Sequence, residues 1–316
     1  MPEEAPPQAC YGLDIGAVSL VAARDDGELL RNECSDTSTK TVVSFSGKQR
    51  HLGEAAANSL SSNGRNTATA VGRLALMPYA RLAASPLAAH WQFTHGERDG
   101  GGFEMEAQYN GAPRRFSGVQ LLGALLAKVR ATSGAGESPC VALVLPPCVE
   151  AGASQEEKEA ALAFARAAVL DAAEVGGWKP VALPTAMEAA AVALSRKYPA
   201  AEAAAAAAAA EAAVEGAEGG APARHVMLLD MGAASTNVGL IAVDAEPGQQ
   251  LVSESGDAQL GCADFDAAVW AHFASHCKML HKIEVTRSSR LTPTSTPTLT
   301  PNPNPNPTLA LTNPNP

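Results

Sequence analysis

The chain has 316 residues, 46% of them hydrophobic and 18% charged, and its 23 basic against 33 acidic residues give a net charge of −10. The length suits roughly two folded domains, and the 4% of aromatic residues predicts a core of small aliphatic side chains. The acidity disfavours general binding to nucleic acids or membrane surfaces, because both are polyanionic. No membrane-spanning apolar run and no secretory signal are recognisable, which predicts a cytoplasmic protein with the nucleus as a second compartment.

Short apolar runs bounded by turn residues predict a β-meander near the start of the chain. The expected strands are 11–15, 19–23, 28–31 and 41–45, with the turn Asp26-Gly27 between the second and the third. Residues 53–77 are expected to be helical in stretches. The following region, up to about residue 113, has no clear pattern, and its run of three glycines at 100–102 is predicted to be a loop.

Two helices are predicted from capping boxes at their starts. The pattern S-x-x-Q begins at Ser117 and S-x-x-E at Ser154, and each precedes residues suited to a helix. The first helix carries apolar residues at helical spacing, and the second is rich in alanine and ends at Gly176-Gly177. Around them we expect strands at 140–145 and 181–183 and a helix at 185–195.

The last third of the chain changes character twice. Strands are expected at 225–230, 238–243 and 250–254, before a helix with one apolar stripe of Phe265, Val269, Phe273 and Cys277. The alanine-rich stretch 198–223 is predicted to be a low-complexity insertion. The Pro/Asn-rich tail 282–316 and the first residues, 1–10, are expected to be disordered, because the prolines remove backbone donors and few large apolar groups are present.

Two turns share one pattern, in which an Asp at the end of an apolar strand is followed two residues later by Gly. They are Asp14-Ile15-Gly16-Ala17-Val18-Ser19 and Asp230-Met231-Gly232-Ala233-Ala234-Ser235. Small residues let backbone N–H groups approach a phosphate, and a neighbouring carboxylate can hold Mg²⁺ through its water shell. The alternative for each turn is an ordinary hairpin, because Asp and Gly are common in turns.

The order of the motifs favours the phosphate-binding interpretation. Between residues 11 and 278 the sequence resembles the nucleotide-binding domain of the heat shock protein 70 superfamily, most closely its large hundred-and-ten-kilodalton, exchange-factor branch. The segments that carry the resemblance are GLDIGAVS, NECSDTSTKTVVSF, LGEAAANSLSSNGRNTATAVGRL, VALVLPPCVE, AMEAAAVAL, LLDMGAASTNVGLI and GDAQLGCADFD, in this order.

The resemblance implies an α/β, actin-like (ribonuclease H-like) two-lobed ATPase fold with ATP or ADP and Mg²⁺ in the cleft between the lobes. The first lobe would span 11–197 and an incomplete second lobe 224–281. The residues expected at the nucleotide are Asp14, Gly16, Ala17, Val18, Asp230, Gly232, Ala233, Ala234 and Ser235. Asp14 and Asp230 would hold the metal through water. The implied role is a co-chaperone that exchanges nucleotide on a partner chaperone of the heat shock protein 70 family.

Several positions depart from the family pattern. Ala17 and Val18 stand where a hydroxyl pair is usual, and Ala233 and Ala234 stand where glycines are usual. A left-handed backbone at either Ala233 or Ala234 would cost on the order of 1–2 kcal/mol. The usual catalytic lysine falls at Gly72, beside Arg73. The usual acidic residue falls near Ala186, with Glu188 as a displaced candidate. Efficient hydrolysis is therefore not expected, since phosphoryl transfer depends on charges around the γ-phosphate.

Three alternatives to an exchange factor stay open from the sequence. They are an active ATPase, a sugar kinase of the same actin-like superfamily and a non-functional fragment. The resemblance ends near Lys278, and read-through of non-coding sequence is our hypothesis for the tail that follows. An incomplete lobe of this kind would expose apolar surface and unpaired strand edges.

Other candidate sites are weak. His272, His276 and Cys277 have a spacing that can bind zinc, but the Glu of the metalloprotease motif is missing. Gly47-Lys48 lacks the preceding glycine of a Walker motif. The cysteines have neither the spacing of a zinc site nor the density of a disulfide scaffold, so all six are predicted to be thiols outside disulfides.

Overall fold

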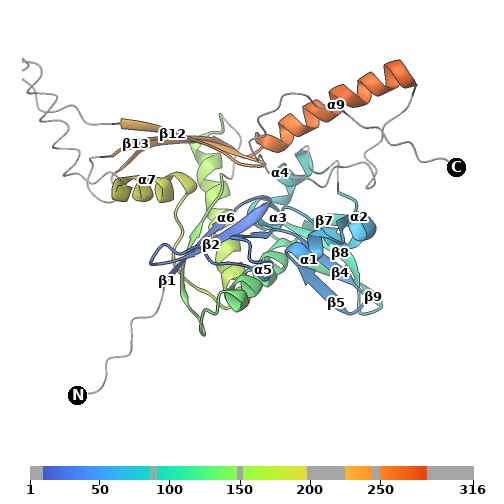
Figure 1. The fold of residues 1–316 in the computed structure, drawn as a ribbon, viewed down its shortest axis with the longest axis horizontal. Helices are drawn as coiled ribbons and strands as arrows, with labels where there is room; N and C mark the ends of the chain where they lie inside the picture. The colour runs from blue at the N-terminus through green and yellow to red at the C-terminus, as the bar shows by residue number, and fades with distance from the viewer. Residues whose placement is uncertain are drawn as a thin grey trace, which may run out of the picture.

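The computed structural model describes residues 10–85, 88, 91–147, 152–197, 225–243 and 250–282. These residues form four β-sheets and the helices packed around them (Figure 1). The alanine-rich insertion 198–223, Cys148 and nearly all of the two segments expected to be disordered, 1–10 and 282–316, lie outside the described residues.

The largest sheet has five strands in the order β11-β10-β1-β2-β3. Its strands are β1 (Cys10–Ile15), β2 (Ser19–Arg24), β3 (Ser38–Lys40), β10 (Cys140–Val144) and β11 (Lys179–Ala182). β1 runs parallel to β10 and antiparallel to β2, as a meander followed by crossovers requires. Asp14 pairs with Val144, so β1 and β10 end at the same edge of the sheet.

Helices α5 (Gly118–Thr132) and α6 (Gln155–Gly176) pack side by side against this sheet (Figure 1). Both begin with the predicted capping boxes, in which the side chain of Ser117 or Ser154 accepts a hydrogen bond from the backbone three residues later. α6 ends at Gly177, whose φ of 73° is left-handed, as expected for a glycine C-cap. These predictions from the sequence are confirmed.

Small residues bring α5 and α6 close together. The buried residues of α6 are Ala161, Ala165, Ala168, Val169, Ala172, Ala173 and Gly176. A Cβ atom added to Gly123 of α5 would lie 2.5 Å from Cγ1 of Val175 and 3.0 Å from the carbonyl oxygen of Ala172. Position 123 therefore accepts no side chain unless α6 moves.

Two three-stranded sheets stand beside the large one, in the orders β5-β4-β6 and β7-β8-β9. Their strands are β4 (Val43–Ser46), β5 (Gln49–Leu52), β6 (Thr67–Ala68), β7 (Thr94–Arg98), β8 (Gly102–Tyr109) and β9 (Ala112–Ser117). The short helices around them are α1 (Glu54–Ala57), α2 (Leu60–Asn63), η1 (Gly64–Asn66), α3 (Val71–Leu76) and α4 (Tyr79–Ala84).

Three sequence expectations are corrected in this region. The predicted strand 28–31 is only an isolated bridge between Leu29 and Ala23. The predicted strand 41–45 begins at Val43, because Thr41 leaves the first sheet to bond with the turn after β1. The region without a clear pattern holds β7, β8 and β9, and the glycines at 100–102 lie where β7 turns into β8.

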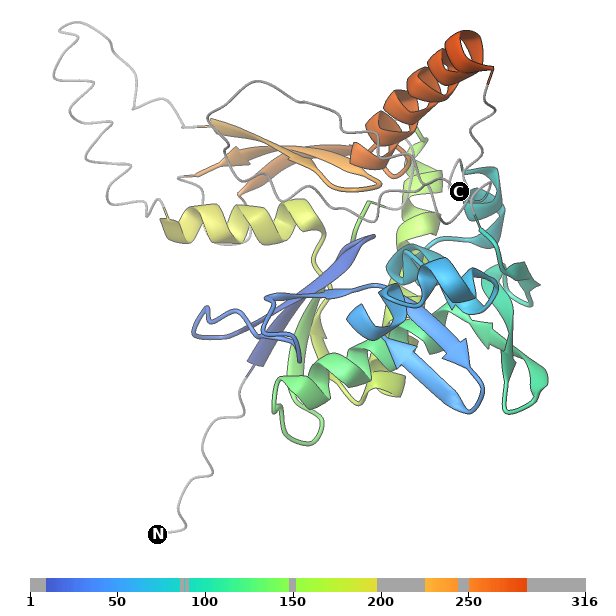
Figure 2. The ribbon, with the colours of Figure 1, turned by 45° about the vertical axis from the view of Figure 1, so that its right-hand side comes forward.

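The second body of the molecule is the sheet β12-β13-β14, with α7 (Ala186–Lys197) on one face. Its strands are β12 (His225–Met231), β13 (Thr236–Ala242) and β14 (Leu251–Asp257). A small core of Ala191, Ile241 and Val243 joins the helix to the sheet. Helix α9 (Cys262–His281) extends away from the end of this sheet (Figure 2), and its predicted apolar stripe is exposed at Phe265, Val269 and Phe273.

None of the helices among the described residues is both long and apolar enough to span a lipid bilayer.

Candidate functional site

The two D-x-G turns have the same backbone hydrogen bond. The N–H of Gly16 donates to the carbonyl of Ser19 at 3.1 Å, and the N–H of Gly232 donates to the carbonyl of Ser235 at 2.8 Å. Each turn joins two antiparallel strands, β1 to β2 and β12 to β13. In Figure 2 the second sheet lies across the end of β1, so the two turns come from different bodies and meet between them.

Asp14 and Asp230 are brought together by this arrangement. Water reaches Asp14, yet the surrounding protein removes enough of its hydration to raise the pKa of its carboxyl above the ordinary value. The negative charge of Asp230 is the second cause and raises the pKa of Asp14 further. The two carboxylates therefore repel each other across the space between the lobes, which is an arrangement that a cation would stabilise.

Arg73 joins the two bodies at this point. It lies on α3 of the first lobe with 6% of its surface exposed, and its Nη1 donates a hydrogen bond of 2.5 Å to the carbonyl of Ala234. From the sequence, Arg73 is only the neighbour of Gly72, where the usual lysine is missing. Its contact with the second turn could not be read from spacing, because 161 positions separate the two residues.

The second turn is also held by the start of α9. The N–H groups of Cys262 and Ala263 donate to the carbonyls of Gly232 and Ala233 at 3.0 and 2.9 Å. A Cβ on Gly261 would lie 2.5 Å from the nitrogen of Ala234, so only glycine fits at this contact. The segment 257–264, which carries part of the family resemblance, is thus the support of the second turn.

Thr41 holds the first turn in position. It was not among the site residues predicted from the sequence. It is fully buried, its Oγ1 donates to the carbonyl of Ala17 at 2.6 Å, and its N–H donates to the carbonyl of Val18 at 2.9 Å. The signal in the sequence was a threonine next to the apolar pair Val42-Val43, where a buried hydroxyl requires a partner.

The backbone at the substituted glycines carries no left-handed strain. Among the described residues, the non-glycine residues with positive φ are Ser35, Ala70, Asn110, Ser138 and Lys282, so neither Ala233 nor Ala234 adopts that conformation. The cost considered for these two alanines therefore does not arise. The turn accommodates both methyl groups with an ordinary backbone.

The two positions expected to lack catalytic charges have structural roles. Gly72 is buried against the first turn, where an added Cβ would lie 2.9 Å from Cγ2 of Ile15 and 3.1 Å from the carbonyl oxygen of Gly16. Glu188 caps α7, because its carboxylate accepts the N–H of Thr185 at 2.7 Å and its own N–H donates to the Thr185 hydroxyl. Glu188 is therefore held at the start of its own helix.

The donor set suits a hydrated metal rather than a fully protein-bound one. The described residues contain no group of three or more His, Cys, Asp or Glu side chains that could hold a metal, and His272 and His276 simply stack with ring centroids 6.4 Å apart. Mg²⁺ keeps several waters and often takes only one or two carboxylates together with phosphate oxygens. The pair Asp14 and Asp230 fits that form of binding.

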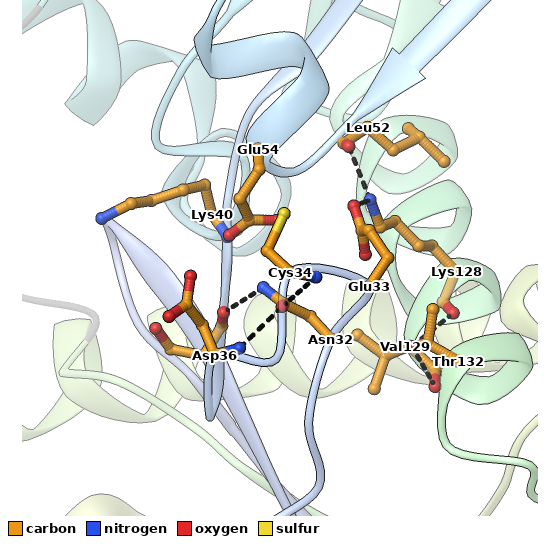
Figure 3. Close-up of polar contacts among 11 residues, drawn as sticks. Asn32, Glu33, Cys34, Asp36, Lys40, Leu52, Glu54, Lys128, Val129 and Thr132 are labelled. Carbon is orange, nitrogen blue, oxygen red and sulfur yellow. Dashed lines mark hydrogen bonds and ion pairs between the residues drawn. The ribbon is translucent and has the colours of Figure 1, made fainter.

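The segment 32–36, within another part of the resemblance, is a self-contained turn close to the large sheet (Figure 3). The Asn32 amide oxygen accepts the N–H groups of Cys34 and Asp36 at 2.8 and 3.0 Å, and its nitrogen donates to the carbonyl of Ser38 at 2.7 Å. Lys128 of α5 pairs with Glu33 and donates to the carbonyl of Leu52 at 2.8 Å. This segment fixes the path into β3 and lies apart from the two D-x-G turns.

The chain matches a known protein family over most of its length. A family model described as Hsp70 protein matches residues 10–294, which includes both D-x-G turns and extends beyond Lys278, where the sequence analysis ended the resemblance. The mixed α/β, actin-like fold class predicted from the sequence is confirmed.

Curated relatives match over most of the chain at low identity. The chain is similar to a heat shock protein homolog of Lachancea kluyveri, at 27% identity over 89% of this chain and 37% of the relative. The corresponding heat shock protein homolog of Saccharomyces cerevisiae is 26% identical over 89% of this chain and 37% of its own length. "Putative heat shock 70 kDa protein 7" of Homo sapiens is 24% identical over 91% of this chain and 71% of its length. The chain therefore spans little more than a third of the yeast relatives.

Proposed function

The chain belongs to the Hsp70 family, and we propose that it is an ATP-binding, chaperone-type protein that holds Mg²⁺–nucleotide between its two D-x-G turns. The observation that supports this proposal most directly is that adjacent residues of α3 contact the two turns, Gly72 against Gly16 and Arg73 hydrogen-bonded to Ala234. The raised pKa of Asp14, caused by lost hydration and by the charge of Asp230, agrees with it. Two acidic groups that repel each other at a junction between two bodies provide a place for a metal-bound polyphosphate.

The backbone of the two turns would bind the phosphates. We assign this role to Gly16, Ala17 and Val18 in the first turn, and to the second turn from Gly232 to Ser235. Asp14 and Asp230 would hold the hydrated Mg²⁺, which neutralises the phosphate charge when bound. Arg73 adds positive charge beside the second turn, which would favour a polyanionic ligand there.

Slow hydrolysis is part of the proposal. Gly72 carries no charged side chain, and its contacts with Ile15 and Gly16 leave no space for one while the first turn keeps its position. A missing charge near the γ-phosphate lowers the rate of phosphoryl transfer by orders of magnitude. Steady release of phosphate at ordinary ATPase rates would favour an active ATPase instead.

We further propose that the chain acts as a co-chaperone on a partner of the Hsp70 family, by promoting nucleotide exchange. The similarity to the two yeast heat shock protein homologs supports this role, and a cytoplasmic location is proposed with it. The test is the release of labelled ADP from a purified Hsp70 chaperone with and without this chain. An unchanged release rate over a wide concentration range would remove the exchange role and leave the nucleotide proposal to be judged separately.

Thermal unfolding tests nucleotide binding. Saturating ATP with Mg²⁺ should raise the melting temperature of the wild-type chain, because a ligand that binds only the folded state stabilises it, by about 2.7 kcal/mol at a hundred times Kd. Asp14→Asn should reduce the shift, whereas Asp171→Asn on the exposed side of α6 should keep it. A wild-type chain that does not respond to ATP or ADP would contradict the proposal.

A further inference from the structure

Two cysteines face each other at the beginning of the large sheet. Cys10 opens β1 and Cys140 opens β10, and the two residues are direct partners in the parallel pairing of these strands. The Cys140 side chain lies near enough to the Cys10 thiol to be among the causes that raise the pKa of Cys10. Cys10 is exposed and Cys140 half-buried, so a small reagent in water can reach the pair.

The spacing of paired strands suits a covalent bond between them. Neighbouring strands lie about 4.8 Å apart, and the Cα atoms of disulfide-bonded cysteines lie about 4.4–6.8 Å apart. From this geometry we propose that Cys10 and Cys140 form a reversible disulfide that links the starts of β1 and β10.

The reaction requires an oxidant, for which a low-molecular-weight disulfide such as glutathione disulfide is sufficient. The exposed Cys10 thiolate attacks one sulfur of the reagent, which forms a mixed disulfide and releases one thiol. The Cys140 thiolate then attacks the Cys10 sulfur, the protein disulfide forms and the second reagent thiol leaves. The two protein thiols lose two electrons and two protons in total, and the reagent is reduced to two thiols.

The environment of the pair slows the first step of this reaction. Lost hydration is the first cause that raises the pKa of Cys10, and the Cys140 thiol and the Asp25 carboxylate raise it further. A thiol with a raised pKa stays largely protonated and reacts slowly. Asp25 also accepts the backbone N–H of Cys10 at 3.4 Å, which fixes the first residue of β1 in register.

The disulfide would form at the starts of β1 and β10, at the opposite end of these strands from Asp14. β1 and β10 both run from the cysteine pair toward the edge where Asp14 pairs with Val144. Because the disulfide joins residues that are already adjacent in the folded state, it should stabilise the first lobe mainly by restricting the unfolded chain. This inference does not depend on the proposed function, and nucleotide affinity should change little on oxidation.

Peptide mapping under non-reducing conditions tests the proposal. The reduced, folded chain is incubated with glutathione disulfide, alkylated and digested, and the linked peptides are identified by mass spectrometry. We expect one dominant disulfide, between Cys10 and Cys140, in the wild type and in Cys34→Ser, and its loss in Cys10→Ser and Cys140→Ser. Cys34 is the matched control because it is exposed and belongs to the separate turn around Asn32 (Figure 3).

Thermal unfolding of the oxidised chain gives a second measurement. The melting temperature of the wild type should rise by several degrees on oxidation and return on reduction, whereas that of Cys10→Ser should not change. Glutathione that stays attached to Cys10 without transfer to Cys140 would overturn the proposal. So would a Cys10–Cys140 linkage that forms only in denaturant, because the folded geometry would then not be its cause.

Discussion

The guanidinium of Arg73 is hydrogen-bonded to the carbonyl of Ala234, across 161 positions of sequence. It ties α3 in the first lobe to the turn that follows β12 in the second. Because the contact is buried, each body depends on the other for the position of its turn. The relative placement of Asp14 and Asp230 follows from this link as well as from the strands that carry them.

Replacement of Arg73 tests this link. Arg73→Met keeps much of the length of the side chain and removes the donor, which leaves the buried carbonyl of Ala234 without this hydrogen bond. We expect a loss of about 1–3 kcal/mol in the free energy of unfolding. Denaturation in urea measures it, with Arg114→Met on exposed β9 as the control. Equal stability of the two variants would mean that the contact contributes nothing.

The raised pKa of Asp14, caused first by lost hydration and then by the charge of Asp230, predicts a pH dependence of stability. Since the pKa of Asp14 is raised in the folded state, its ionisation costs more there than in the unfolded chain. Stability therefore falls as the pH rises from the ordinary Asp pKa, about 3.9, through the higher value of the folded state. The difference in unfolding free energy between Asp14→Asn and the wild type isolates this group from the other carboxylates.

Without metal or nucleotide, the free energy of unfolding of Asp14→Asn should increase relative to that of the wild type as the pH rises through that window. This difference should shrink when Mg²⁺–nucleotide is added, because the wild-type carboxylate then has a cation beside it. Asp171→Asn serves as the control at every pH. A constant difference between Asp14→Asn and the wild type would contradict a raised pKa of Asp14 in the folded state.

Ala70 offers a stabilising substitution. It precedes α3 with φ 54° and ψ 40°, a left-handed conformation that costs about 1–2 kcal/mol for a residue with a Cβ. Ala70→Gly should therefore raise the free energy of unfolding by about 0.5–1 kcal/mol after the entropy of glycine is included. The matched control is Ala163→Gly, exposed within α6, which should lose about 1 kcal/mol. A loss at both positions would contradict the assignment of strain to Ala70.

Gly72 tests how tightly α3 lies against the first turn. Gly72→Ala introduces a Cβ 2.9 Å from Ile15 and 3.1 Å from the carbonyl of Gly16, so we expect a loss of about 1–3 kcal/mol from overpacking. Weaker nucleotide binding should accompany it, because the Gly16 carbonyl belongs to the turn. Gly136→Ala, where the added Cβ meets open space, should leave both stability and binding nearly unchanged.

Patterns among residues close in sequence predicted the helix ends, which are formed by such residues. The capping boxes at Ser117 and Ser154 predicted the starts of α5 and α6, and the glycines after residue 175 predicted the end of α6, because caps are formed by residues three or four positions apart. β8 was missed although Phe103, Met105 and Ala107 alternate as a strand should, since polar and glycine-rich neighbours obscured the period. The two D-x-G turns were found from a local pattern that both share, and the resemblance to a family favoured their interpretation as phosphate-binding turns.

The rest of the site is non-local. The hydrogen bonds of Thr41 to the first turn, of Arg73 to the second turn and of Cys262 to Gly232 join segments that are distant in the sequence. Nothing in the spacing of these residues indicates their partners. The identity of Glu188 as a helix cap likewise required the observed position of Thr185, although the T-x-x-E pattern was present in the sequence.

The alanine content of the chain has a geometric consequence in the pair α5 and α6. Where Gly123 meets Ala172 and Val175, the two backbones are near van der Waals contact, so the distance between the helix axes is set by the absence of side chains. Substitutions should therefore be accepted very unequally around α6. Side chains on the outward side of α6 can vary freely in size, whereas those on the side toward α5 must stay small. The distance between the two helices that pack against the sheet containing β1 is therefore fixed.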